Sequence, residues 1–222
     1  MSVRFWFGPE TVGTIAYLAH NEDLIPRLCG SIFIDIAGNR NSLALQRTRQ
    51  DSHLLDRIAR HVLKKRFGWF REGEFAQVAP NDERVVNGPG VNVPSIGLSR
   101  FPYDEYHTTD DNLDIIHEDL LLEMADVTEE IIRIYASNYI PKRTFRGPLF
   151  LSGNGLWVDW RDNWALNRAI EKIMMSLEGR ESIFEIAEKV NLDYWMVRDY
   201  IEKFRVKGFV VPLPIPSEAQ TA

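Results

Sequence analysis

The feature that most constrains the fold is an alternation of short apolar runs with longer helical patterns in the part of the chain before Pro141. Short runs of β-branched and aromatic residues favour buried strands, whereas apolar residues three and four positions apart favour amphipathic helices. The expected strands cover residues 3–7, 31–38, 43–48, 75–79 and 93–99, and the expected helices cover residues 11–20, 52–66 and 119–136. This alternation predicts an α/β domain over residues 1–141, with a mixed β-sheet flanked by helices.

The pattern becomes helical in the last third of the chain. Helical segments at residues 163–179, 182–191 and 193–208 precede the short extended piece "FVVPLPIP". That order is typical of a winged-helix domain, which we expect at residues 164–216, after a connector at 142–163 and before a tail at 217–222. Ser182, with Glu185 three residues later, predicts a capping box at the start of the second helix.

Composition and charge exclude several classes of function. The chain is 45% hydrophobic and 26% charged, and its net charge of −6 argues against general binding of nucleic acids, which relies on Lys and Arg. From Arg161 to Ala222 nine basic residues stand against ten acidic ones, so a protein-contact role for the helical segment is favoured over DNA binding. No apolar run reaches the roughly 20 residues that span a bilayer, which favours a cytoplasmic protein with no membrane partner. The single Cys29 is expected to be a small buried residue.

Three residues of the α/β part could carry chemistry, and each also has a structural explanation. Glu10 stands at a strand-to-helix turn, where the helix dipole alone would favour it. Asp35 interrupts the apolar run "IFIDIA", where a carboxylate needs a partner such as a metal ion or an arginine. His107 stands among carboxylates in "SRFPYDEYHTTDDN", and such neighbours can orient a metal-bound imidazole, although a loop histidine without a ligand role is the alternative.

Several segments of the chain together resemble one protein family. They are "FGPETVGTIAYLA", "IFIDIAG", "LALQR", "NDERVVNGPGVNVPSIGLSR" and "YDEYHTTDDNLDII". In their order and spacing they resemble a bacterial family of aminopeptidase-like proteins of largely unassigned function, which have the zinc-dependent aminopeptidase fold and a C-terminal winged helix. The resemblance extends over nearly the whole chain. It implies a hydrolase of the metallopeptidase class that uses zinc and acts on a small peptide or another amide.

The resemblance also implies roles for individual residues. Glu10 would be the general base that takes a proton from water, and His107 and Asp35 would be metal ligands. The residues expected behind the metal or against the substrate are Asp110, Asp111, Asp82, Arg84 and Tyr106. For Asp82 and Arg84 a turn cap and a surface ion pair are the alternative explanations.

Two departures from the family pattern bear on activity. Glu10 is followed by Thr11 where related enzymes have a second glutamate, and nine residues precede Glu10 where related enzymes have a longer region with a histidine and an aspartate ligand. We therefore expect a chain truncated at its N-terminus, with a partial zinc-aminopeptidase fold and an incomplete metal site. The expected partner is a separately encoded N-terminal half or a second copy of the chain, and the alternative function is a non-catalytic binding or regulatory protein.

Overall fold

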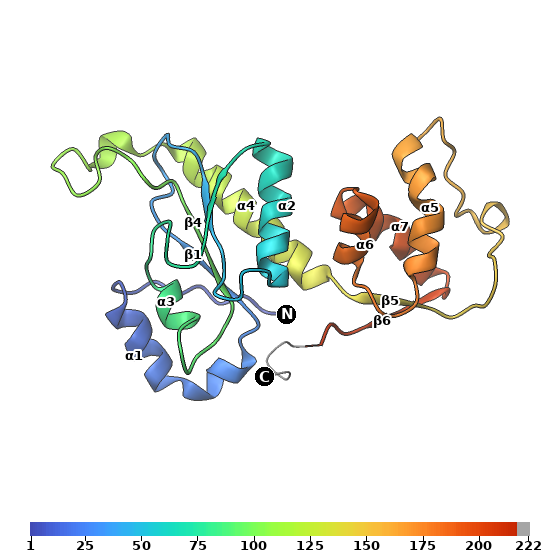
Figure 1. Ribbon diagram of the computed structural model, residues 1–222, viewed down its shortest axis with the longest axis horizontal. Helices are drawn as coiled ribbons and strands as arrows, with labels where there is room; N and C mark the ends of the chain where they lie inside the picture. The colour runs from blue at the N-terminus through green and yellow to red at the C-terminus, as the bar shows by residue number, and fades with distance from the viewer. Residues whose placement is uncertain (217–222) are drawn as a thin grey trace. The chain divides into compact units, whose positions relative to one another are not determined.

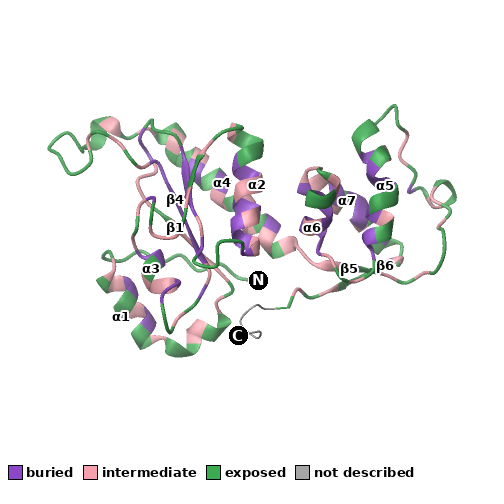
Figure 2. Ribbon diagram, viewed as in Figure 1, coloured by how far each residue is buried: buried purple, intermediate pink, exposed green. Residues whose placement is uncertain are grey.

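The computed structural model describes residues 1–216, and the chain divides into two compact units (Figure 1). The first unit, here called the α/β unit, ends at Ala136, and the second, here called the C-terminal unit, begins at Ser137. Each unit contains buried residues (Figure 2), and most of these are apolar. The two units are therefore described separately.

The α/β unit is built on one four-stranded mixed sheet. Its strands are β1 (Ser31–Ile34), β2 (Ala44–Gln46), β3 (Arg71–Gly73) and β4 (Ser95–Ser99), and their order in the sheet is β1-β4-β2-β3. Strand β4 pairs with β1 in parallel and with β2 in antiparallel fashion, and β2 pairs with β3 in parallel. Every residue of β4 and β2 is buried, whereas β1 is partly exposed at one edge of the sheet. The mixed sheet predicted from the sequence is confirmed.

Helices flank this sheet (Figure 1). They are α1 (Val12–His20), α2 (Leu54–Phe67), α3 (Glu83–Val86) and α4 (Glu118–Ser137), with short 3₁₀ helices η1 (Glu22–Arg27) and η2 (Leu113–Ile115). Helix α2 buries Ile58, Ala59 and Val62 on one face, and its first turn is closed by a capping box between His53 and Asp56. The helical spacing of apolar residues correctly predicted α2 and α4.

Three local predictions in the α/β unit are wrong. Residues 3–7 form no strand: they are extended but exposed, with Phe5 at 77% and Phe7 at 88% relative exposure. Residues 75–79 are turns and bends, and the nearby strand is β3 instead. Cys29 is exposed rather than buried. Residues 3–7 and Cys29 have patterns that suit a strand and a core, but no neighbouring element covers them. Residues 75–79 include the buried Val78, and hydrogen bonds from Val78 and Ala79 to the Gln46 side chain hold them in turns instead of a strand.

The C-terminal unit is a helical cluster beside a small two-stranded sheet. Its elements are β5 (Ile140–Arg143), η3 (Ser152–Asn154), α5 (Trp164–Ser176), α6 (Ile183–Val190), α7 (Tyr194–Val206) and β6 (Val210–Leu213). Strands β5 and β6 pair in antiparallel fashion, and the three helices pack on one another around the fully buried Phe184, Tyr194 and Phe204. The predicted capping box of Ser182 and Glu185 is present at the start of α6.

A membrane-spanning segment would need a long and strongly apolar helix. Among residues 1–216, no helix has both the length and the apolar character to cross a membrane.

Candidate functional site

Three elements of the α/β unit meet at one place, where β1 ends and where α1 and α3 begin. Helix α3 packs against β1, and α1 packs against α3. The two helices are joined by the Asp82 carboxylate, which accepts hydrogen bonds from the Thr11 N–H (2.5 Å) and from the Thr14 hydroxyl (2.6 Å). A carboxylate at a helix N-terminus satisfies free amide groups and is favoured by the helix dipole. Asp82 therefore holds the start of α1 beside α3, and with it the adjacent Glu10.

Asp35 follows the last residue of β1 directly and lies between these helix starts. Its carboxylate accepts hydrogen bonds from the Ile36 N–H (2.8 Å) and from the Asn81 side-chain amide (3.4 Å). Partial burial is the largest influence on its pKa and raises it above the ordinary value, and the nearby negative charges of Glu10 and Asp82 raise it further. Within residues 1–216 no arginine pairs with Asp35, so the expected arginine partner is not there.

A buried network behind Asp35 supports the loop that carries Asn81. Both oxygens of the Glu83 carboxylate accept from the Asn81 N–H (2.9 and 3.0 Å), and one also accepts from the Gln46 side-chain amide (2.7 Å). Burial raises the pKa of Glu83 above its ordinary value. The Gln46 side-chain carbonyl in turn accepts a hydrogen bond from the Val78 N–H (2.9 Å). Sequence reasoning missed this network, although a polar Gln46 at the end of the apolar run "LAL" was a visible signal.

Glu10 and Arg84 are both exposed near this place. Glu10 lies just before α1, which begins at Val12, and it is close enough to Asp35 to influence its pKa. Arg84 lies on α3, and its side-chain Nε donates to the backbone carbonyl of Asn81 (3.2 Å). An exposed arginine held by the same loop is placed for contact with a charged ligand, which remains a prediction.

His107 lies in a separate, exposed loop. Its backbone has a positive φ of 60°, and its imidazole stacks on the Tyr106 ring with a centroid distance of 3.9 Å. The Asp111 carboxylate, an expected orienting group for His107, instead accepts from the Tyr103 hydroxyl (2.7 Å), and Asp110 bonds through its backbone N–H to the Thr108 hydroxyl (3.2 Å). Among the hydrogen bonds of residues 1–216, none joins a carboxylate to the His107 ring.

The structure thus brings Glu10, Asp35 and Asp82 together and leaves His107 with aromatic neighbours. A catalytic zinc site generally needs three protein ligands. In the part of the chain that the structure describes, no three His, Cys, Asp or Glu side chains are arranged to hold a metal ion. Both oxygens of Asp82 are also already engaged by α1. The described residues by themselves do not fit a catalytic zinc ion.

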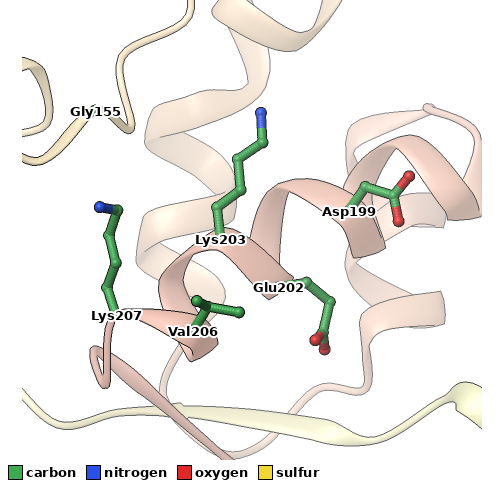
Figure 3. Close-up of a pocket in the computed structure, with 6 residues that line it drawn as sticks. All are labelled: Gly155, Asp199, Glu202, Lys203, Val206 and Lys207. Carbon is green, nitrogen blue, oxygen red and sulfur yellow. The ribbon is translucent and has the colours of Figure 1, made fainter.

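A hollow of about 410 Å³ lies in the C-terminal unit over α7. The lining residues are Gly155, Asp199, Glu202, Lys203, Val206 and Lys207 (Figure 3). Two ammonium groups and two carboxylates share this surface, so it has no single charge with which to select a phosphate or a carboxylate ligand. The hollow is therefore a weaker candidate for chemistry than the carboxylate cluster, the group formed by Glu10, Asp35 and Asp82.

The fold places the chain in a known structural class. It is similar to a crystal structure described as "putative peptidase from Clostridium acetobutylicum", with a TM-score of 0.80 and 23% sequence identity over 93% of this chain and 47% of that one. The α/β fold with its mixed sheet is therefore that of a solved peptidase-like structure. More particularly, residues 1–138 match the model of the family DUF4910, described as a domain of unknown function, and the chain belongs to this family.

A curated relative aligns with most of the chain, beyond the residues that match the family model. It is described as "Putative polysaccharide biosynthesis protein with aminopeptidase-like domain" from Clostridium acetobutylicum, and it is 26% identical over an alignment of 211 residues that covers 89% of this chain and 46% of the relative. The chain spans about half the length of this relative and of the similar crystal structure. A weaker likeness, to an aminopeptidase from Aneurinibacillus sp. strain AM-1, has a TM-score of 0.47 and 21% identity over 55% of this chain and 29% of that one, and it supports no conclusion.

Proposed function

We propose that the α/β unit is the carboxylate-bearing part of an aminopeptidase-like hydrolase domain that acts on a peptide or another amide. The observation that carries this proposal is the proximity of Glu10 to Asp35, whose pKa is raised by partial burial and further by the negative charge of Glu10. Perturbed carboxyl groups with a specific charged neighbour are frequent at catalytic sites. The aminopeptidase-like domain in the name of the curated relative supports the same class of reaction.

Hydrolysis of an amide needs one group that accepts a proton from the attacking water and one that gives a proton to the leaving amine. Glu10 is exposed beside the start of α1, where water and substrate can reach it. Asp35 is partly buried, and this burial, together with the nearby negative charge of Glu10, raises its pKa above the ordinary value. We assign both proton transfers to Glu10: its carboxylate accepts a proton from the attacking water and then gives that proton to the leaving amine, while Asp35 has a supporting role beside it. Zinc would need ligands beyond those that the described residues bring together, so no step is assigned to it.

The C-terminal unit is proposed to be a winged-helix-like module that contacts protein. Three packed helices beside the antiparallel pair of β5 and β6 support this assignment. On α7 and at its C-terminal end, Lys203 and Lys207 line the same surface as Asp199 and Glu202 (Figure 3). This mixture favours contact with a protein of similarly mixed charge over contact with phosphates.

A non-catalytic binding or regulatory module is the second candidate. It is favoured by the engagement of Asp82 and Glu83, whose oxygens hold α1 and the Asn81 loop rather than facing solvent. Carboxylate oxygens that are used in structural hydrogen bonds are less available for metal binding or proton transfer, which leaves fewer groups for catalysis.

The test compares hydrolysis of several aminoacyl p-nitroanilides by the chain alone and by the chain mixed with the remaining half of the Clostridium acetobutylicum relative, both with added Zn²⁺. We expect turnover in the mixture, and we expect Glu10→Gln to lower it by roughly 10²- to 10⁴-fold. Glu22→Gln, which changes another exposed glutamate in the same unit, is the matched control. Complex formation is measured in the same samples, so a complex without turnover would favour the binding module.

A further inference from the structure

Two exposed tryptophans of the C-terminal unit meet where the chain enters α5. The Trp160 and Trp164 rings are arranged edge to face, with centroids 6.2 Å apart and planes at 85° to each other. They are 56% and 61% exposed, although tryptophan is highly buried on average in folded proteins. Trp157, three residues earlier, is exposed as well. We call the pair of Trp160 and Trp164 the tryptophan corner.

The tryptophan corner belongs to a unit that has a core of its own. The family model matches residues 1–138, and the C-terminal unit lies almost entirely beyond them. The segment before α5 is fastened to this unit, because the Tyr200 hydroxyl donates to the Leu156 carbonyl (3.1 Å) and the Asn167 side-chain amide donates to the Val158 carbonyl (2.8 Å). Exposed apolar groups on such a fixed surface generally mark an interaction site.

Two arginines stack on the rings of the corner. The Arg161 guanidinium lies over the Trp160 ring at 6.0 Å and is itself fixed by the Asp159 carboxylate (3.0 and 2.8 Å). The Arg168 guanidinium lies over the Trp164 ring at 5.6 Å. Each cation occupies one side of its ring by a cation–π contact, so a ligand would use the remaining sides. Cations already beside both rings disfavour a cationic ligand.

The geometry of the corner favours proline over a ligand with a broad flat face. Rings at a right angle do not make one flat platform of the kind on which successive bases stack. Their angle instead accommodates a compact apolar ring. Aromatic-lined surfaces bind proline-rich segments in several peptide-binding domains, because such segments are already extended and lose little conformational entropy on binding.

The chain has a segment with this chemistry after α7. Residues 211–216 read "VPLPIP", with proline at every second position, and we call them the proline-rich segment. Each proline fixes its own φ and restricts the preceding residue to extended conformations. Pro214 and Pro216 are exposed, and Figure 1 shows the chain after β6 running away from the loop that precedes α5. These two prolines therefore do not lie at the tryptophan corner of their own chain.

Charge complementarity supports the same occupant. Arg168 and Lys172 stand one turn apart on α5, and neither forms an ion pair with any of residues 1–216. Glu171 beside them offsets only one of these two charges. In the sequence, Glu218 follows the proline-rich segment by two positions. A carboxylate close behind the prolines suits a surface with an unpaired cation close to the tryptophans.

We propose that the proline-rich segment of one chain docks in the tryptophan corner of a second copy. Pro214 and Pro216 contact the open sides of the Trp160 and Trp164 rings, and the negative charge of Glu218 complements the cations of α5. Each copy offers both a segment and a corner, so two copies can exchange segments in a closed pair. The proposal concerns the C-terminal unit and does not depend on hydrolysis by the α/β unit.

The first experiment measures binding of a labelled synthetic peptide, residues 210–222, by fluorescence anisotropy. The receptor is the 222-residue chain with Pro214→Ala and Pro216→Ala, whose own segment then competes less. We expect saturable binding, which a further Trp160→Ala weakens by roughly tenfold or more, because aromatic anchors dominate such interfaces. Trp69→Ala, a change of a 70% exposed tryptophan in the α/β unit, is the matched control and leaves the affinity unchanged. Circular dichroism of each variant establishes that the fold is retained.

Self-association of the unaltered chain gives a second and independent readout. Light scattering over a concentration series should show the mass rising from one copy towards two. Either Trp160→Ala or the paired change of Pro214 and Pro216 to alanine should raise the concentration of half-association by roughly tenfold or more. Added salt should weaken the association, since one part of the contact is between opposite charges.

Three results would overturn the proposal. The first is no peptide binding at millimolar concentration, including the case in which an oligosaccharide such as cellohexaose binds the corner instead. The second is peptide binding that Trp160→Ala leaves unchanged. The third is an unaltered chain that stays monomeric well above the dissociation constant of the peptide, because its own segment would then fill the corner.

Discussion

At the scale of single residues, Asp35 combines a position at the end of a strand with an unfavourable electrostatic environment. Burial and the charges of Glu10 and Asp82 raise its pKa, and its described partners are two amide groups. A residue kept only for stability would not be placed in this way, because a neutral side chain would be less costly there. The position is typical of a group retained for chemistry or for contact with a cation.

Asp35→Asn is therefore expected to stabilise the α/β unit at neutral pH by about 0.5–1 kcal/mol. Because the pKa of Asp35 is raised in the folded chain, its stabilising contribution is present below the ordinary pKa of 3.8 and is lost as the pH rises through the folded value. The variant and the parent should thus have similar free energies of unfolding in acid and diverge as the pH increases. Urea denaturation across this pH range measures the difference in the free energy of unfolding. A variant that is less stable than the parent at pH 7 would contradict the prediction, because the carboxylate would then have a favourable partner.

At the scale of elements, the start of α1 depends on a residue about seventy positions away in sequence. The Thr11 backbone at this start has an unusual positive φ of 59° and supplies no side-chain cap, so the cap comes from Asp82. Asp82→Ala should cost about 0.5–2 kcal/mol, the range found for loss of a helix cap. Asp82→Asn keeps one acceptor oxygen and should cost less.

The measurement that checks this is hydrogen exchange of the α1 amides together with urea denaturation. If α1 exchanges equally in Asp82→Ala and in the parent, the helix is held by other contacts, and the proposed placement of Glu10 through Asp82 is wrong.

Local pattern predicted elements well where burial follows from the chain's own neighbours. Helices α2, α4 and α6 have apolar residues at helical spacing, and the starts of α2 and α6 carry capping boxes. Residues 3–7 have an equally clear strand pattern but remain exposed, because a strand also needs an adjacent strand, and this cannot be read from the segment itself. The same reason explains why β3 was missed: its pairing with β2 is decided outside the segment.

As with the helices and strands, the sequence predicted only part of the candidate site. Asp35 was found because a carboxylate in an apolar run is conspicuous, and the structure places it beside Glu10 and Asp82. Glu83 was not found, because its burial arises from a contact with Gln46, thirty-seven residues earlier. The roles assigned to these residues stay predictions.

At the scale of the whole molecule, the chain joins two units whose cores are built differently. The α/β unit has an open sheet edge and exposed apolar side chains. The C-terminal unit buries Phe184, Tyr194, Tyr200 and Phe204 in a core of its own, although other aromatic residues of the unit, such as Trp164, are exposed. The Tyr194 and Ser137 hydroxyls are hydrogen-bonded to each other (3.1 Å), and the Tyr200 hydroxyl donates to the Leu156 backbone carbonyl (3.1 Å). Both buried tyrosine hydroxyls therefore have partners inside the unit. Satisfied polar groups and a closed core are the features of a segment that folds without help.

We therefore expect a fragment from Ser137 to Ala222 to fold alone, with helical circular dichroism and a single cooperative unfolding transition. The buried Phe184 and Phe204 lie in the centre of its core, so Phe204→Ala should remove about 3–5 kcal/mol from the free energy of unfolding of the fragment. The exposed Val206, only two residues further on the same helix, is the control, since Val206→Ala should change it by less than about 0.5 kcal/mol. Thermal unfolding of the fragment and the full chain checks both values. A fragment that unfolds without a cooperative transition would mean that the core of the C-terminal unit is completed by residues before Ser137, and that the two units fold as one.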